Sequence, residues 1–189
     1  MKIKLETMLA ALAFSFAAQA AAPEDTLIIK LKDGDVKIAL RPDLAPKHVA
    51  QIKALAKKGF YDGVVFHRVI DGFMAQTGDG QFGDSDGNFN LSAAGTGGSD
   101  MPNIPAEFSK EPFVRGTIGM ARSQDPDSAN SQFFIMFAPG DFLNGQYTVV
   151  GQVETGMELV DKIKKGDQNN NGSVADPDKM ISVKTAADK

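Results

Sequence analysis

The sequence predicts a mainly β fold that closes into a barrel. Short segments that alternate apolar and polar residues recur along most of the chain, as they do in half-buried strands. Apolar residues recur at helical spacing in two segments only, 46–58 and 157–165. The 19 glycines among 189 residues favour many turns. A sheet of many short strands with few helices loses its exposed edges when it closes on itself.

Length and composition fit one globular domain. Apolar residues make up 42% of the chain and charged residues 23%, which is ordinary for a globular protein. The net charge is −4 and no run of Lys or Arg stands out, so we expect no nucleic-acid partner. The absence of cysteine excludes a disulfide, a thiol nucleophile and a thiolate metal site. We expect a monomer that needs no cofactor or metal.

The first 22 residues have the layout of a secretory signal peptide. Two lysines lie among the first five residues, residues 8–18 are apolar, and small residues surround a cleavage point after Ala20 or Ala22. The apolar run is shorter than the about 20 residues that a membrane-spanning helix needs, so we expect no stable membrane insertion. The sequence therefore predicts removal of 1–22 and export of one domain, 23–189, to the periplasm or outside the cell.

The first elements of that domain are a hairpin and a helix. Residues 26–31 and 36–40 alternate apolar and polar side chains on either side of a turn that contains Gly34. Residues 46–58 follow with helical spacing, and a proline lies in the first turn. Gly59 marks the end of this helix.

A second hairpin lies at the centre of the predicted site. Its strands are 64–70 and 73–77, joined by Asp71-Gly72, a dipeptide that favours a tight turn. Because side chains in a strand repeat with period two, Arg68 is expected on the opposite face from His67. We therefore expect His67 to have a structural, hydrogen-bonding role.

Arg68 is the unusual residue of this hairpin. Strand periodicity predicts that it shares a face with Phe66 and Ile70. A guanidinium among large apolar groups is costly unless function requires it. The turn brings further side chains back beside it, namely Phe73, Met74 and Gln76. The stretch thus predicts an apolar pocket that contains one fixed cation.

The remaining chain continues the β pattern. Residues 78–103 are rich in Gly, Asp, Asn and Ser and predict a long loop. The later elements are strands at 114–121, 131–137, 147–153 and 179–185, with a short helix at 157–165 before Gly166.

Several ordered motifs resemble those of the cyclophilin family of peptidyl-prolyl cis-trans isomerases. The first runs from Phe66 to Asp79 and the second from Ser128 to Ile135. Shorter family segments follow the same order, at 95–98, 107–108, 119–121 and 142–145. The resemblance covers about 26–185 and implies a closed, eight-stranded antiparallel β-barrel capped by two α-helices. Relative to the family, residues 80–94 have the character of an insertion.

The resemblance also implies the site. Arg68 is expected to be catalytic, and the substrates are expected to be proline-containing polypeptides. The substrate-binding residues carried over by motif position are Phe73, Met74, Gln76, Ala121, Arg122, Gln132, Phe133, Phe142, Leu143 and Tyr147. Phe142 and Tyr147 are departures, since many relatives have tryptophan and histidine there. We expect Phe134 to alternate away into the core, and Glu107 to support the scaffold.

This residue set fits a reaction in which no bond is made or broken. Rotation about a prolyl amide crosses a barrier of about 18–20 kcal/mol because it breaks amide resonance. The twisted nitrogen regains a lone pair that a fixed donor such as Arg68 can bind, whereas the planar amide offers little to bind. Two other functions fit less well: a non-catalytic peptide-binding or chaperone module with the same groove, and a barrel that carries an apolar ligand.

One further pattern resembles a calcium loop. Residues 167–178 place oxygen-bearing side chains at positions one, three and five, glycine at six and an acid at twelve. The last position is Asp178 instead of glutamate, and a strand rather than a helix is expected to follow. Asn-Gly and Asp-Pro are also common in turns, so we expect a turn-rich loop here rather than a metal site.

Overall fold

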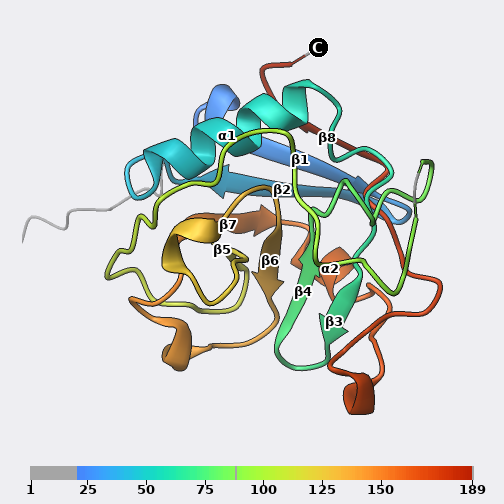
Figure 1. The fold of residues 1–189 in the computed structure, drawn as a ribbon. Helices are drawn as coiled ribbons and strands as arrows, with labels where there is room; N and C mark the ends of the chain where they lie inside the picture. Colours follow the sequence, from blue (N-terminus) through green and yellow to red (C-terminus); the bar gives the residue numbers. More distant parts are fainter. Residues whose placement is uncertain (1–20, 88, 189) are drawn as a thin grey trace, which may run out of the picture.

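A computed structural model describes residues 21–87 and 89–188 and shows one eight-stranded antiparallel sheet that curls around a core (Figure 1). The strands follow the order β3-β4-β6-β5-β7-β2-β1-β8. Their bounds are β1 Thr26–Leu31, β2 Gly34–Leu40, β3 Arg68–Ile70, β4 Met74–Thr77, β5 Thr117–Met120, β6 Phe133–Met136, β7 Val149–Thr155 and β8 Ser182–Thr185. The predicted mainly β fold with eight antiparallel strands is confirmed.

The barrel closes through irregular segments instead of a regular ladder between β3 and β8. Phe66 N donates to Asp178 O at 2.9 Å, and Met180 N donates to Val64 O at 2.9 Å. Val65 and Lys179 form an isolated antiparallel bridge between the same two segments. Because residues 64–66 make these cross-connections, the regular strand β3 begins only at Arg68.

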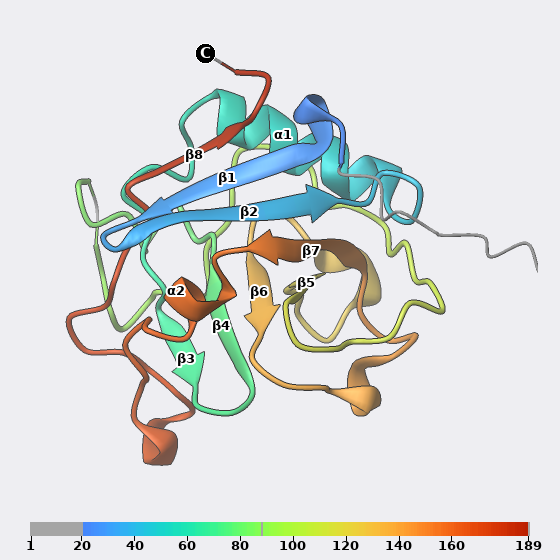
Figure 2. The ribbon, with the colours of Figure 1, turned by 180° about the vertical axis from the view of Figure 1, so that it is seen from behind.

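In the described part of the chain, two α-helices accompany the sheet. Helix α1 (Pro46–Lys57) covers one end of the barrel and packs against β8, and α2 (Met157–Val160) lies near β2 on the other side (Figure 2). Helix α2 is shorter than predicted, because residues 161–163 form a turn and bend beyond it. Glu107 supports the start of α1, since its carboxylate accepts from the Lys47 and His48 backbone N–H groups and contacts His48 Nδ1 at 2.6 Å. None of the helices in the described ranges combines the length and apolarity needed to cross a bilayer.

The buried apolar residues form two clusters. The larger one fills the barrel and includes Phe66, Val69 and Phe133. The smaller one lies outside the barrel wall and includes Met74, Phe134 and Leu143. Strand periodicity predicted that Phe66 shares a face with Arg68, and this prediction is wrong, because Phe66 lies in the barrel core. The chain at residues 66–67 is not a strand, so the alternation of faces is interrupted there.

The long loop after β4 is anchored by a single carboxylate. Asp79 is fully buried, and its two oxygens accept from the backbone N–H groups of Gln81, Phe82, Gly95 and Gly97 at 2.7–3.0 Å. One residue thus fixes both the beginning and the end of the segment 80–94.

The predicted signal peptide falls almost entirely on residues 1–20, which lie outside the described residues. The described chain starts beside the short helix η1 (Pro23–Asp25) that leads into β1.

Candidate active site

The hairpin β3–β4 places a cation and an amide directly opposite each other. Arg68 pairs with Gln76 and Ile70 pairs with Met74 in the antiparallel register. The turn between the strands contains Gly72 with a φ of 70°, a conformation that glycine adopts without steric cost. The short hairpin therefore presents Arg68, Gln76 and Met74 toward one side of the barrel wall.

Three hydrogen bonds hold the Arg68 guanidinium. Nη1 donates to Gln76 Oε1 at 3.2 Å, Nε donates to Asn171 O at 3.0 Å, and Nη2 donates to Asn171 Oδ1 at 2.9 Å. Partial burial lowers the pKa of Arg68, but arginine stays charged in proteins. A guanidinium has five N–H donors, so one on Nη1 and one on Nη2 remain for another acceptor. Arg68 is oriented without an ion pair to any described carboxylate.

A series of hydrogen-bonded side-chain amides continues from Arg68. Gln76 Nε2 donates to Gln132 Oε1 at 3.0 Å, and Gln132 Nε2 donates to Gly97 O at 2.8 Å. These bonds fix which end of each amide carries the oxygen. Gln76 and Gln132 therefore have defined orientations before any substrate binds.

An apolar pocket of about 270 Å³ lies beside Arg68. Its buried residues are Met74, Phe134 and Leu143, all members of the smaller apolar cluster. Phe142, which is 66% exposed, forms an open rim with Phe73, and the two ring centroids are 5.5 Å apart. The predicted residues that line this pocket are Arg68, Phe73, Met74, Gln76, Ala121, Arg122, Phe142, Leu143 and Tyr147.

Phe133 does not line this pocket, contrary to the prediction. It is 1% exposed, belongs to the barrel core and packs edge-on against Tyr61 at 5.7 Å. Its neighbour Phe134, which was expected in the core, lines the pocket. The alternation of the two rings was predicted correctly, but the faces were exchanged. The residue that indicates the correct face is Gly119 of β5, which lies directly opposite Phe134. A Cβ at Gly119 would overlap the Phe134 ring.

A second pocket, lined mainly by polar residues and glycines, adjoins the first. It contains Gln132, shares Gln76, Ala121 and Arg122 with the apolar pocket, and extends to the segment 95–97. The Arg122 guanidinium lies over the Tyr147 ring, 4.4 Å from its centroid, and donates to Gln146 O. Gln132 is the one predicted residue that lies in this adjoining pocket and not in the apolar one.

His67 differs from its predicted role. It is 4% exposed, and neither ring nitrogen makes a well-formed hydrogen bond within the described chain. Burial lowers its pKa to about 4, against the opposing effect of the nearby Asp79 carboxylate and of the Val65 carbonyl. The ring is therefore neutral at physiological pH, with the Val65 carbonyl as a weak acceptor beside it.

The calcium-like loop uses its acids for other contacts. Asp167 caps the short helix η4 (Gln168–Asn170) by accepting from Asn169 N at 2.9 Å. Asp178 pairs with Lys32 Nζ at 2.7 Å, and Asp176 is fully exposed. Within residues 21–87 and 89–188, no three His, Cys, Asp or Glu side chains are grouped as a metal site.

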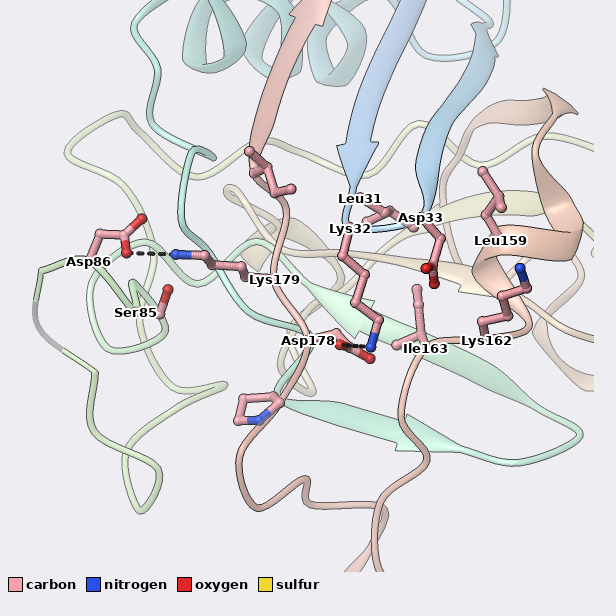
Figure 3. A pocket seen from close by; sticks show the side chains of 12 residues that line it. Leu31, Lys32, Asp33, Ser85, Asp86, Leu159, Lys162, Ile163, Asp178 and Lys179 are labelled. Atoms are coloured by element: carbon pink, nitrogen blue, oxygen red, sulfur yellow. Dashed lines mark hydrogen bonds and ion pairs between the residues drawn. The ribbon is translucent and has the colours of Figure 1, made fainter.

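A separate pocket of about 360 Å³ lies at the far end of β1 (Figure 3). Leu31, Leu159 and Ile163 provide apolar surface, and two ion pairs lie across it, Lys32–Asp178 at 2.7 Å and Lys179–Asp86 at 2.6 Å. None of the residues predicted for the site lines this pocket.

Comparisons with known proteins identify the family. The profile of the family described as cyclophilin type peptidyl-prolyl cis-trans isomerase/CLD matches residues 26–185. A probable peptidyl-prolyl cis-trans isomerase of Brucella suis is 68% identical over 171 residues, which cover 90% of this chain and 87% of the relative. Peptidyl-prolyl cis-trans isomerase A of Dickeya dadantii is 36% identical and covers 95% of this chain and 92% of its own.

Solved structures agree. A cyclophilin of Hirschia baltica superposes with a TM-score of 0.74 at 25% identity, covering 90% of this chain and 77% of that one. A Cryptosporidium parvum cyclophilin, crystallised in the presence of the dipeptide Ala-Pro, gives a TM-score of 0.71 at 26% identity and covers 85% of this chain and 98% of its own. The chain belongs to the family of cyclophilin-type peptidyl-prolyl cis-trans isomerases.

Proposed function

We propose that this peptidyl-prolyl cis-trans isomerase acts on unfolded or extended polypeptides that have been exported from the cytoplasm, and that Arg68 is its catalytic residue. The observation that carries the assignment is the position of Arg68 at the edge of the apolar pocket, with two N–H donors that no described residue uses. Membership of a family of isomerases favours a catalytic role over the alternative of a non-catalytic peptide-binding or chaperone module.

The proline ring occupies the apolar pocket in this account. Met74, Phe134 and Leu143 contact its apolar face, and Phe73 and Phe142 form the open rim. The Cryptosporidium parvum relative was crystallised with a proline-containing dipeptide, which supports an occupant of this chemistry. A pocket that is open on one side admits a proline within a longer chain, so free termini are not required.

Arg68 then stabilises the twisted amide. Rotation localises a lone pair on the prolyl nitrogen, and the free guanidinium N–H groups donate to it. A hydrogen bond to a charged group contributes about 1.5–3 kcal/mol, which corresponds to about ten- to a hundredfold in rate. The remaining acceleration comes from the apolar surroundings, because the planar amide is the more polar state and loses more on leaving water.

Gln76, Gln132 and the main chain at Ala121 hold the peptide backbone. Their amide orientations are fixed by the chain of hydrogen bonds that starts at Arg68. Preset donors and acceptors lower the entropy cost of placing the substrate in the reactive geometry.

The action on unfolded chains is tested by refolding. A small protein whose slow folding phase is limited by a non-native prolyl isomer is refolded with and without the enzyme. We expect the wild-type enzyme to accelerate the slow phase and R68K to accelerate it far less, since lysine lacks the rigid fork. An unaltered slow phase, combined with activity on short peptides, would restrict the function to accessible loops of folded proteins.

Export is tested by expressing the full chain in a Gram-negative host. The leader composition supports a periplasmic destination, which predicts release of the protein by osmotic shock. N-terminal sequencing then gives a mature chain that starts at Ala21 or Pro23. Retention of residues 1–20 on a cytoplasmic protein would contradict the proposal.

A further inference from the structure

Arg122 lies where the two adjoining pockets of the site meet. It lines the apolar pocket, which contains Phe134, and the neighbouring pocket that contains Gln132, which we call the polar pocket. Arg122 is partly exposed, and Gln76 and Ala121 are the other residues that line both pockets. A polypeptide whose proline occupies the apolar pocket and whose chain continues through the polar pocket therefore passes this side chain.

The Arg122 guanidinium is held between two loops. Nη1 donates to Ser123 O at 2.8 Å and to Gln124 O at 3.4 Å, within its own loop. Nε and Nη2 donate to Gln146 O at 3.3 Å and 2.9 Å, in the loop that leads to β7. The guanidinium also lies 4.4 Å from the centroid of the Tyr147 ring, a cation–π contact that stabilises this position. The side chain is thus ordered in advance and loses little conformational entropy when a substrate binds beside it.

No ion pair in residues 21–87 and 89–188 includes Arg122. Its four hydrogen bonds all end on backbone carbonyls. The two acids of its own loop bind backbone N–H groups instead, since Asp125 accepts from Asp127 N at 2.9 Å and Asp127 accepts from Ala106 N at 2.8 Å. A guanidinium has five N–H donors, so one on Nη2 remains that no described residue uses. Arg122 therefore presents an unneutralised charge and a donor to an incoming group.

The site is positively charged although the protein is acidic. The net charge of the chain is −4, but Arg68 and Arg122 are the only residues with a formal charge among the described residues that line the apolar and polar pockets. Asp141 precedes the rim residue Phe142 but lines neither pocket. The pocket at the far end of β1 differs, because three lysines and three aspartates line it. A cleft lined by charges of one sign attracts groups of the opposite sign.

We propose that Arg122 is a specificity-determining residue that favours substrates with an acidic side chain, Asp or Glu, next to the proline, in the part of the chain that crosses the polar pocket. The inference rests on the proposed function, because it assumes that the proline occupies the apolar pocket. The two cations then have separate roles: Arg68 binds the twisted prolyl amide, and Arg122 attracts a flanking carboxylate. Because the attraction is electrostatic, salt weakens it.

The test compares peptides that differ in one charge. Asp and Asn have nearly the same shape, so each pair of short Xaa-Pro peptides has one or the other at a single position: two residues before the proline, directly before it or directly after it. Exchange NMR at about pH 7.5, where Asp is ionised, gives the ratio of kcat/KM for the Asp peptide to that for the Asn peptide. A partly exposed ion pair predicts a ratio of about two to five at low salt in one pair, and a ratio near one in about 0.5 M NaCl. The pair that shows the preference gives the position of the acidic residue.

Variants locate the preference. R122Q removes the charge and retains hydrogen-bonding atoms, whereas R122K retains the charge without the planar fork. R115Q is the matched control, because it also removes one positive charge and Arg115 lies outside both pockets. We expect a ratio within about 1.5-fold of one in R122Q, an intermediate ratio in R122K and the wild-type ratio in R115Q. Each ratio is taken within one variant, so a general loss of activity cancels. A preference that R122Q retains would assign it to Arg68 and overturn the inference.

A second measurement needs no variant. The Nε–H resonance of Arg122 in the wild-type enzyme is followed by NMR during titration with the two peptides of a pair. A larger shift change with the Asp peptide supports the inference, and equal responses overturn it. Equal kcat/KM within every pair, or a ratio that salt does not change, also overturns the inference but leaves the proposed function intact. A wild-type enzyme that isomerises none of the peptides contradicts the proposed function itself.

Discussion

Asn171 accepts two hydrogen bonds from Arg68, one on its backbone carbonyl at 3.0 Å and one on its side-chain oxygen at 2.9 Å. It does so from a left-handed conformation with a φ of 52°, which asparagine adopts more readily than most residues. The neighbouring Gly172 donates a hydrogen bond to the loop and accepts one from β3. The segment is therefore fixed on the strand that carries Arg68. Asn171 is therefore a positioning residue for the guanidinium.

We predict that N171G lowers kcat about three- to tenfold with a smaller change in KM. Glycine retains the positive φ and the backbone carbonyl, so the variant removes only the side-chain bond to Nη2, which is worth about 1 kcal/mol. Exchange NMR and binding titration on the same peptide separate kcat from KM. N169G is the matched control, because Asn169 is exposed in the same loop and does not contact Arg68. Equal kcat values for N171G and wild type would remove Asn171 from the account.

The exchanged faces of the two adjacent phenylalanines give a matched pair of variants. F133L is expected to lower the free energy of unfolding by about 1 kcal/mol or more while kcat/KM of the folded protein stays close to wild type, since the ring lies in the barrel core. F134L removes part of the proline pocket, so we expect kcat/KM to fall about fivefold or more. Denaturant unfolding and peptide kinetics are measured for both. The opposite assignment of effects would restore Phe133 to the site.

The activity is expected to be independent of pH from about pH 7 to about pH 9. Burial lowers the pKa of both His48 and His67, the latter to about 4, so neither ring titrates in this range. Arginine stays protonated throughout. The pH dependence of kcat/KM for one peptide checks this. A bell-shaped profile centred near the ordinary histidine pKa of about 6.5 would indicate proton transfer and contradict the mechanism.

Because of His67, we also expect the free energy of unfolding to decrease at acidic pH. Its folded-state pKa of about 4 lies below the ordinary value of 6.5, so the unfolded chain binds more protons between these two pH values. The contribution of the neutral ring is complete above about pH 6.5 and is lost as the pH falls toward 4, by up to about 3 kcal/mol. Chemical denaturation of wild type and H67Q at pH 7 and pH 5 measures the difference. Parallel losses in the two proteins would show that His67 does not titrate differently on folding.

The sequence predicted the order of the elements and most of the pocket, because alternation and turn residues are local signals. It did not predict that β3 begins only at Arg68, since residues 64–66 form hydrogen bonds with the distant segment 178–180. Such closure depends on tertiary contacts that no local pattern encodes.

The assignment of Phe133 failed for a related reason. Period two shows that neighbouring rings face opposite sides, but it does not say which side is the pocket. The pairing of Phe134 with Gly119 on β5 shows which ring faces the pocket, but this pairing is known only from the strand register. The contact between Arg68 and Asn171 was also missed, because the two residues are separated by 103 positions.

The most direct test of the central claim measures catalysis and binding in one experiment on R68A. Relaxation-based exchange NMR of a short Xaa-Pro peptide gives both the cis/trans rate on the enzyme and the Kd. R115A is the matched control, since Arg115 pairs with Asp161 at 2.6 Å and lies outside the pockets around Arg68. We predict that R68A lowers the exchange rate by about ten- to a hundredfold and changes the Kd by less than about tenfold, while R115A behaves as wild type. An R68A enzyme that exchanges the bound peptide at the wild-type rate would contradict the claim that this cation stabilises the twisted prolyl amide.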